Sequence, residues 1–150
     1  MPAAQPARVR YLDGAPALET LVNGSPQNLG SNAYLQVDSQ TVVSIFDYGS
    51  MSTFLPIAAG THKLIARNTL GYFVGPLSTT ALGPGKRYTL IVVGSYPHYR
   101  VLTFEEPAAS ANAAVSLYGA SPSTPQASFG TFKASTDTDF KQLGSARFGT

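Results

Sequence analysis

The sequence "YTLIVV" at residues 88–93 decides the fold. Its side chains form two alternating sets, both mostly apolar: Tyr88, Leu90 and Val92, and Thr89, Ile91 and Val93. Successive side chains of a β-strand point to opposite faces of its sheet. A strand that is apolar on both faces is covered on both sides or lies in the middle of a sheet. We therefore expect this stretch to be a central strand.

The chain on either side of this strand is a series of short apolar runs between turns. Gly occurs 14 times and Pro 11 times, and no segment keeps the apolar spacing of an amphipathic helix over three turns. Runs rich in Val, Ile, Thr, Tyr and Phe predict strands at residues 8–12, 18–22, 33–37, 41–47, 51–57, 61–67, 72–74, 77–81, 87–93 and 99–105. Strands this short and frequent indicate an all-β sandwich or barrel.

Composition limits the possible partners. Hydrophobic residues make up 43% of the 150 residues, which is enough for a core, and the net charge is +2. The basic residues form no clustered stripe, so we expect no nucleic-acid partner. No apolar run is long enough for a membrane span. The absence of Cys excludes disulfides, thiolate metal ligands and a thiol nucleophile.

Two stretches of similar sequence predict how the chain is divided. "VRYLDGAP" at residues 9–16 and "VSLYGASP" at residues 115–122 both begin with Val and have Pro at the eighth position. We expect a spacer at residues 1–7, a sandwich domain at 8–107, a small-residue linker at 108–114 and a partial second repeat at 115–150. The alternative is chance similarity between Gly- and Pro-rich β sequences. A fragment of about 40 residues cannot bury a core alone.

The sequence offers little for catalysis. His62 has the phase of an inward strand residue, which favours a core or rim position, and His98 lies in the loop "GSYPHYR". No Gly-x-Ser-x-Gly motif is present, and the histidines and carboxylates lack metal-site spacing. The adjacent Glu105 and Glu106 face opposite ways on a strand and cannot act as a pair. We expect no catalytic residues, no metal and no cofactor. The sequence leaves open whether Pro97 is cis.

Aromatic side chains are the remaining candidates for binding. Tyr96, His98 and Tyr99 belong to one loop, and Tyr72 and Phe73 lie in another. Exposed aromatic rings on sandwich loops can bind carbohydrate or protein by stacking. The alternative is that these side chains close the ends of the sandwich.

Several segments together resemble a known family. These are "ARVRYLDGAP", "YLQVDSQTVVSIFDYGSMSTF", "LPIAAGTHKLIA", "GPGKRYTLIVVGS" and "YRVLTFEEP". They resemble the bacterial domain of unknown function numbered 4397, whose members are extracellular, immunoglobulin-like β-sandwiches often found in tandem. The resemblance covers residues 8–107. Residues 17–32 look like an insertion, and Pro56 stands two residues earlier than the usual Pro of this family.

The resemblance implies an immunoglobulin-like antiparallel β-sandwich in a bacterial exported or cell-envelope protein. Residues 1–10, "MPAAQPARVR", lack the features of a signal peptide, so we expect that a signal was removed. The implied role is a non-enzymatic structural or interaction module. A half-complete sandwich has open edges, which favour strand addition with a protein partner or with a second copy. The alternative is a carbohydrate-binding module that uses Tyr96, His98 and Tyr99.

Overall fold

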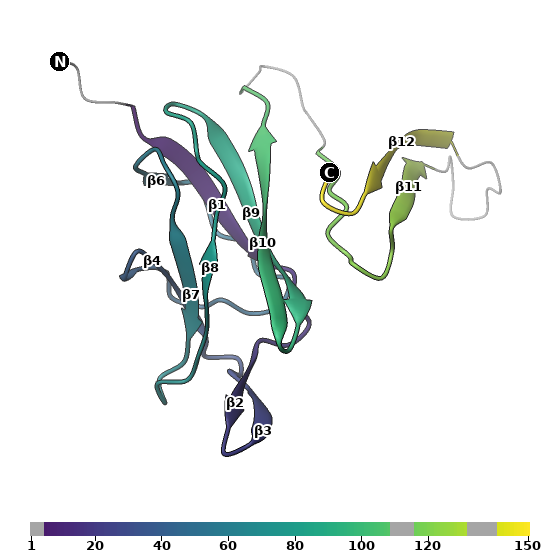
Figure 1. The fold of residues 1–150 in the computed structure, drawn as a ribbon. Coiled ribbons are helices and arrows are strands. Elements are labelled where there is room, and N and C mark those ends of the chain that lie inside the picture. The colour runs from purple at the N-terminus through teal and green to yellow at the C-terminus, as the bar shows by residue number, and fades with distance from the viewer. Residues whose placement is uncertain (1–4, 109–115, 132–140) are drawn as a thin grey trace. The chain divides into compact units, whose positions relative to one another are not determined.

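The computed structural model describes residues 5–108, 116–131 and 141–150 (Figure 1). The chain divides into two compact units, residues 1–108 and 109–150. The described residues form strands and no helix, which confirms the all-β prediction. None of them belongs to a helix that could cross a membrane.

The first unit contains two four-stranded sheets and a separate hairpin (Figure 1). The first sheet has the order β10-β9-β1-β6, the second β5-β4-β7-β8, and the hairpin is β2-β3. The strands are β1 (Ala7–Asp13), β2 (Glu19–Val22), β3 (Ser25–Asn28), β4 (Tyr34–Val37), β5 (Gln40–Val43), β6 (Leu55–Ile57), β7 (Lys63–Arg67), β8 (Phe73–Ser78), β9 (Arg87–Ser95) and β10 (His98–Glu106).

Strand β9 is the central strand that the sequence predicts. It pairs antiparallel with β10 and parallel with β1, and every residue from Tyr88 to Val93 is buried. The parallel pair departs from the expected antiparallel arrangement. Beyond β1 the chain stays close to β9, because the Gly14 amide donates a hydrogen bond to the Val92 carbonyl. A Cβ at Gly14 would lie 2.8 Å from Cγ2 of Ile91, so this approach requires glycine.

The second sheet differs from the predicted strands in two places. Strand β8 is continuous through the cis Gly75–Pro76 bond, where the sequence predicted two strands. Strands β5 and β6 are shorter than the predicted strands at residues 41–47 and 51–57. The reason is that the chain passes from the second sheet to the first between β5 and β6, so residues 44–54 cannot continue either strand.

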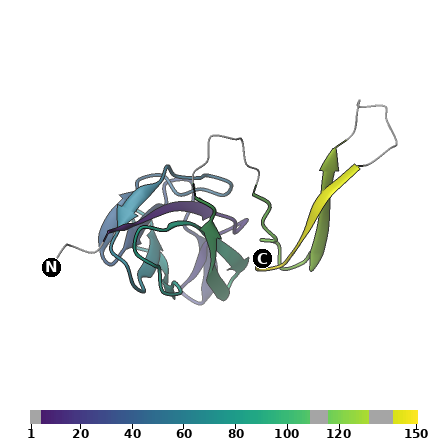
Figure 2. The same cartoon turned by 90° about the horizontal axis from the view of Figure 1, so that it is seen from above.

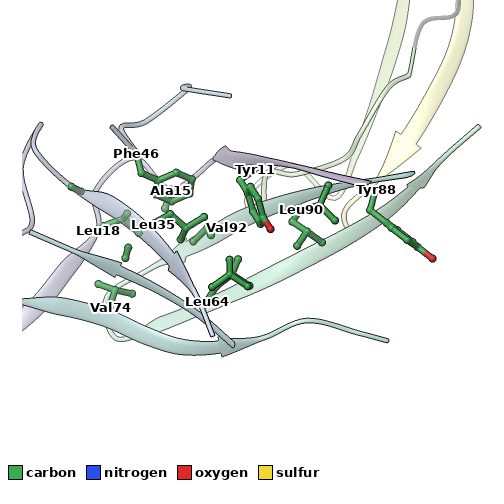
Figure 3. Packing of buried hydrophobic residues seen from close by; sticks show 14 of the residues in the cluster. Tyr11, Ala15, Leu18, Leu35, Phe46, Leu64, Val74, Tyr88, Leu90 and Val92 are labelled. Carbon is green, nitrogen blue, oxygen red and sulfur yellow. The ribbon is translucent and has the colours of Figure 1, made fainter. Parts of the chain in front are cut away.

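The two sheets lie face to face (Figures 1 and 2), and their inner faces share one apolar core (Figure 3). Val9 and Tyr11 come from β1, and Leu90 and Val92 from β9. They pack with side chains of the second sheet, namely Leu35, Leu64, Ala66 and Val74. Each fully buried aliphatic side chain contributes about 1.5–3 kcal/mol relative to an exposed one. A core between two sheets is what the predicted β-sandwich requires.

Residues 17–32, which look like an insertion in the sequence, contain the hairpin β2-β3. The turn residues Asn23 and Gly24 have φ of 50° and 82°. Both values are positive, as a two-residue hairpin turn of this kind needs, and the Asn-Gly pair adopts them at little cost.

The second unit is a two-stranded antiparallel sheet of β11 (Gln126–Thr131) and β12 (Lys141–Arg147). Extra C-terminal strands are therefore present in the segment predicted as a partial second repeat, residues 115–150. The stretch at residues 115–122, whose sequence resembles that of β1 and the turn after it, differs from β1 in structure. Val115 lies outside the described residues, and residues 116–122 form one isolated parallel bridge, Gly119 to Phe148, rather than a strand.

Candidate functional site

The predicted aromatic loop is a tight hairpin turn. Tyr96 and Pro97 connect β9 to β10, Ser95 pairs with His98, and the Tyr96–Pro97 bond is cis. His98 is exposed, whereas Tyr96 and Tyr99 are half-buried. Neighbouring side chains on β10 point to opposite faces, so His98 and Tyr99 do not form one surface.

Tyr99 is occupied by contacts within the fold. Its hydroxyl donates a hydrogen bond to the Ala17 carbonyl at 2.8 Å and accepts one from the Glu19 amide at 2.9 Å. Its ring packs against the core, and burial raises the pKa of the phenol. Tyr99 therefore holds the segment that leads into β2.

The two residues of the second predicted aromatic loop, Tyr72 and Phe73, have different environments. Tyr72 packs against the core, while Phe73 is 44% exposed. The Arg67 guanidinium lies 5.1 Å from the centre of the Phe73 ring. The structure thus turns two of the five predicted residues, Tyr72 and Tyr99, toward the core.

His62 occupies the buried position that its strand phase predicts. Its Nδ1 lies 2.6 Å from Oδ2 of Asp38, and its Nε2 lies 2.9 Å from the Ala58 carbonyl. The bond to His62 and a second bond from the Lys63 amide lower the pKa of Asp38. Both ring nitrogens face acceptors, which leaves neither free to act as a base. Nowhere in the described ranges do three His, Cys, Asp or Glu side chains gather as a metal site would need.

The adjacent glutamates have separate partners. Glu105 bonds Lys86 Nζ at 2.9 Å on the surface. Glu106 accepts a hydrogen bond from Arg10 Nη2 at 2.9 Å and another from the Thr89 hydroxyl. The two carboxylates therefore cannot meet on one substrate, as the strand alternation predicts. Although Glu106 is the last residue of β10, its side chain is largely buried, with 7% of it exposed.

A pocket of about 290 Å³ lies at one end of the first unit, and the sequence did not predict it. Three connections, with the strand ends that lead into two of them, form it: residues 13–18 from the last residue of β1, residues 28–33 from the last residue of β3 and residues 46–48 after β5. Figure 3 shows Ala15, Leu18 and Phe46 of its wall at one end of the core. No local motif signals such a site, because each connection supplies a few residues that are far apart in the sequence.

Asp13 is the most enclosed polar residue of this pocket, with 2% exposure. Its Oδ1 accepts a hydrogen bond from the Ala15 amide at 2.9 Å. Its amide donates to the Ser50 carbonyl and its carbonyl accepts from the Gly49 amide. Burial, together with the nearby charge of Asp47, raises the pKa of the Asp13 carboxyl to about 6. Within the described residues, its Oδ2 receives no hydrogen bond.

The rest of the pocket combines polar and apolar groups. Asp47, Asn28 and Ser31 add polar side chains, and Tyr48 is an aromatic residue that is 65% exposed. Pockets that bind small ligands commonly combine apolar walls with a few convergent polar groups. The lining contains two carboxylates and no Lys, Arg or His. This charge pattern distinguishes the pocket from the aromatic loop.

Comparison with protein families gives a match over most of the chain. A family model described as a domain of unknown function, DUF4397, matches residues 17–129. The matched region begins after β1 and ends in β11, so it includes residues of both units, whereas the resemblance in the sequence covered residues 8–107. No curated protein matches the chain significantly.

Proposed function

The chain belongs to the DUF4397 family, and on this premise we propose that it is a non-enzymatic structural and interaction module of a bacterial exported or cell-envelope protein. In this proposal the module associates with a second copy of itself by strand addition. The open sheet of the second unit is the observation that carries the proposal.

The second unit has little to stabilise it by itself. An isolated two-stranded sheet is marginally stable at best in water. Ala146 is the one hydrophobic side chain buried among its described residues, and Leu143 is 67% exposed. Strands β11 and β12 pair only with each other, so each keeps one edge open in the described structure. Pairing with another strand would satisfy these backbone groups.

Strand β10 supplies a suitable edge on a second copy. It extends from His98 to Glu106, and it ends the order of the first sheet, so its pairing with β9 occupies one edge. Long edge strands accept an added strand through main-chain hydrogen bonds, while side chains on alternate positions set the specificity.

Removal of residues 109–150 tests the proposal. The first unit has its own apolar core, so we expect the shortened chain to remain folded. We expect the full chain to associate in light-scattering measurements and the shortened chain to be monomeric with a lower midpoint of thermal unfolding. An unchanged oligomeric state and unchanged thermal stability would contradict the proposal.

A pair of point variants makes the test sharper. Leu143→Asp should weaken association, because Leu143 is an exposed apolar side chain of β12. Leu70→Asp is the matched control: Leu70 is 75% exposed but lies in the turn between β7 and β8. Equal effects of the two variants on the dissociation constant would argue against an interface at β12.

Carbohydrate binding by Tyr96, His98 and Tyr99 is the less supported alternative, since the Tyr99 hydroxyl is already bonded within the fold. A glycan array with the full chain and with Tyr96→Ala tests it. Retention of a glycan that is lost in the variant would favour this alternative over a purely structural role.

A further inference from the structure

We infer that the pocket formed by residues 13–18, 28–33 and 46–48 binds an alkylammonium group, carried either by a free amine or by a lysine side chain. This site is separate from the strand edges that the proposed function uses. If no ligand binds to this pocket, the proposal that the chain associates with a second copy by strand addition is unaffected.

Unbalanced charge is the first argument. Asp13 and Asp47 both line the pocket, and no basic side chain of the lining neutralises them. Asp13 is 2% exposed, and in the described structure one of its carboxylate oxygens accepts no hydrogen bond. An enclosed carboxylate with no basic side chain beside it in the pocket lining is costly, and a ligand cation with N–H donors would supply the opposite charge and a further hydrogen bond.

The walls of the pocket fit the rest of such a ligand. Ala15, Pro16, Leu18 and Phe46 provide apolar surface for an aliphatic stem. Tyr48 also lines the pocket and is 65% exposed, and the face of an aromatic ring attracts ammonium ions. A lysine side chain combines an apolar stem with a compact charged end, which matches this division of the pocket.

The same features disfavour a metal ion. Calcium takes six to eight oxygen ligands, most of them carboxylates and carbonyls. The pocket has two carboxylates, and Oδ1 of Asn28 already accepts a hydrogen bond from the Gly30 amide. Calcium alone therefore serves as a comparison ligand in the experiment.

The test is a titration of the full ¹⁵N-labelled chain, followed by amide chemical shifts. The probe is Nα-acetyl-lysine methylamide, and the neutral control is Nα-acetyl-norleucine methylamide, which has a similar stem. We expect saturable shifts at Ala15, Gly30 and Phe46 with the lysine probe only. Binding of the norleucine compound with equal affinity, or saturation by calcium alone, would overturn the inference, as would the absence of saturable shifts.

Variants assign the binding to the two carboxylates. We expect Asp13→Asn and Asp47→Asn each to weaken binding of the lysine probe about tenfold, as loss of a charge-assisted bond would. Glu105→Gln removes a surface carboxylate outside the pocket and should leave the affinity unchanged. Unchanged affinity in both aspartate variants would contradict the inference even if the probe binds.

Two further experiments identify the source of the ammonium group and measure how the binding affinity depends on pH. Cadaverine represents a free amine, and a lysine-containing peptide represents a protein partner; binding of either supports the site and identifies its source. Because the pKa of Asp13 is about 6, affinity for the lysine probe should fall between pH 7.5 and pH 5. A constant affinity over this range would show that Asp13 does not contact the charge.

Discussion

At position 13 the chain keeps a carboxylate where an amide of the same shape would fit. Oδ1 of Asp13 accepts the Ala15 amide hydrogen, and an Asn side chain could accept it equally well. The negative charge is therefore not needed to hold the loop. Residues that cost stability in this way are commonly retained for binding or catalysis, which agrees with a role for Asp13 in the pocket.

The pKa of Asp13 gives a prediction about stability. The folded value of about 6 lies above the ordinary value of 3.8, so the folded state holds its proton over a range where the unfolded state has lost it. Unfolding free energy should then fall as the pH rises from about 4 to 6, by as much as about 3 kcal/mol from this residue. In Asp13→Asn this decrease should be absent, and the variant should be more stable than the natural chain at pH 7.

Urea unfolding at pH 4 and pH 7, without ligand, measures this effect. Glu105→Gln is the control, since Glu105 is exposed and outside the pocket. If Asp13→Asn and the natural chain lose the same stability between the two pH values, the charge at position 13 carries no such penalty.

At the scale of elements, Tyr99 connects β10 to the segment before β2. Tyr99→Phe keeps the ring in the core but removes the acceptor of the Glu19 amide and the donor to the Ala17 carbonyl. We expect a loss of about 1–2 kcal/mol in unfolding free energy. The Tyr34 hydroxyl makes no hydrogen bond with any residue that the structure describes, so Tyr34→Phe is a matched control that thermal unfolding should barely distinguish from the natural chain. Equal losses in both variants would contradict a structural role of the Tyr99 hydroxyl.

The elements also show what a sequence can and cannot predict. Tyr88–Val93 was predictable as a central strand because its alternation records burial on both faces directly. The Asn23-Gly24 hairpin was predictable because few residue pairs adopt two positive φ values. The lengths of β5 and β6 were not, since they depend on where the chain leaves one sheet for the other.

The candidate site was less predictable than the fold. The burial of His62 followed from its strand phase, but its bond to Asp38 depends on the pairing of β4 with β7. Aromatic residues in turns suggested a binding loop, yet Tyr72 and Tyr99 face the core. The pocket requires three connections to meet, and no single connection contains enough of it to form a pattern.

At the scale of the whole molecule, the two units differ in how they are stabilised. The first unit has a core shared by two sheets, and the second has a two-stranded sheet. We expect hydrogen exchange to be slow at β9 amides at every protein concentration, and fast at β11 and β12 amides in dilute solution. If strand addition occurs, protection of β11 and β12 should increase with concentration. Protection that is high and independent of concentration would show that the second unit needs no second copy.

The parallel pairing of β1 with β9 also constrains the order of events during synthesis. Strand β1 ends at Asp13, but β9 ends at Ser95, so most of the first unit must leave the ribosome before these strands can meet. Contacts between segments so distant in sequence slow folding, because a long loop must close before any pairing compensates for its lost entropy. Until then β1 lacks its neighbour β9 in the first sheet, and the core that buries Val9 and Tyr11 is incomplete because Leu90 and Val92 are missing from it. The nascent chain is consequently most exposed to aggregation and to chaperones in the interval before Ser95 emerges.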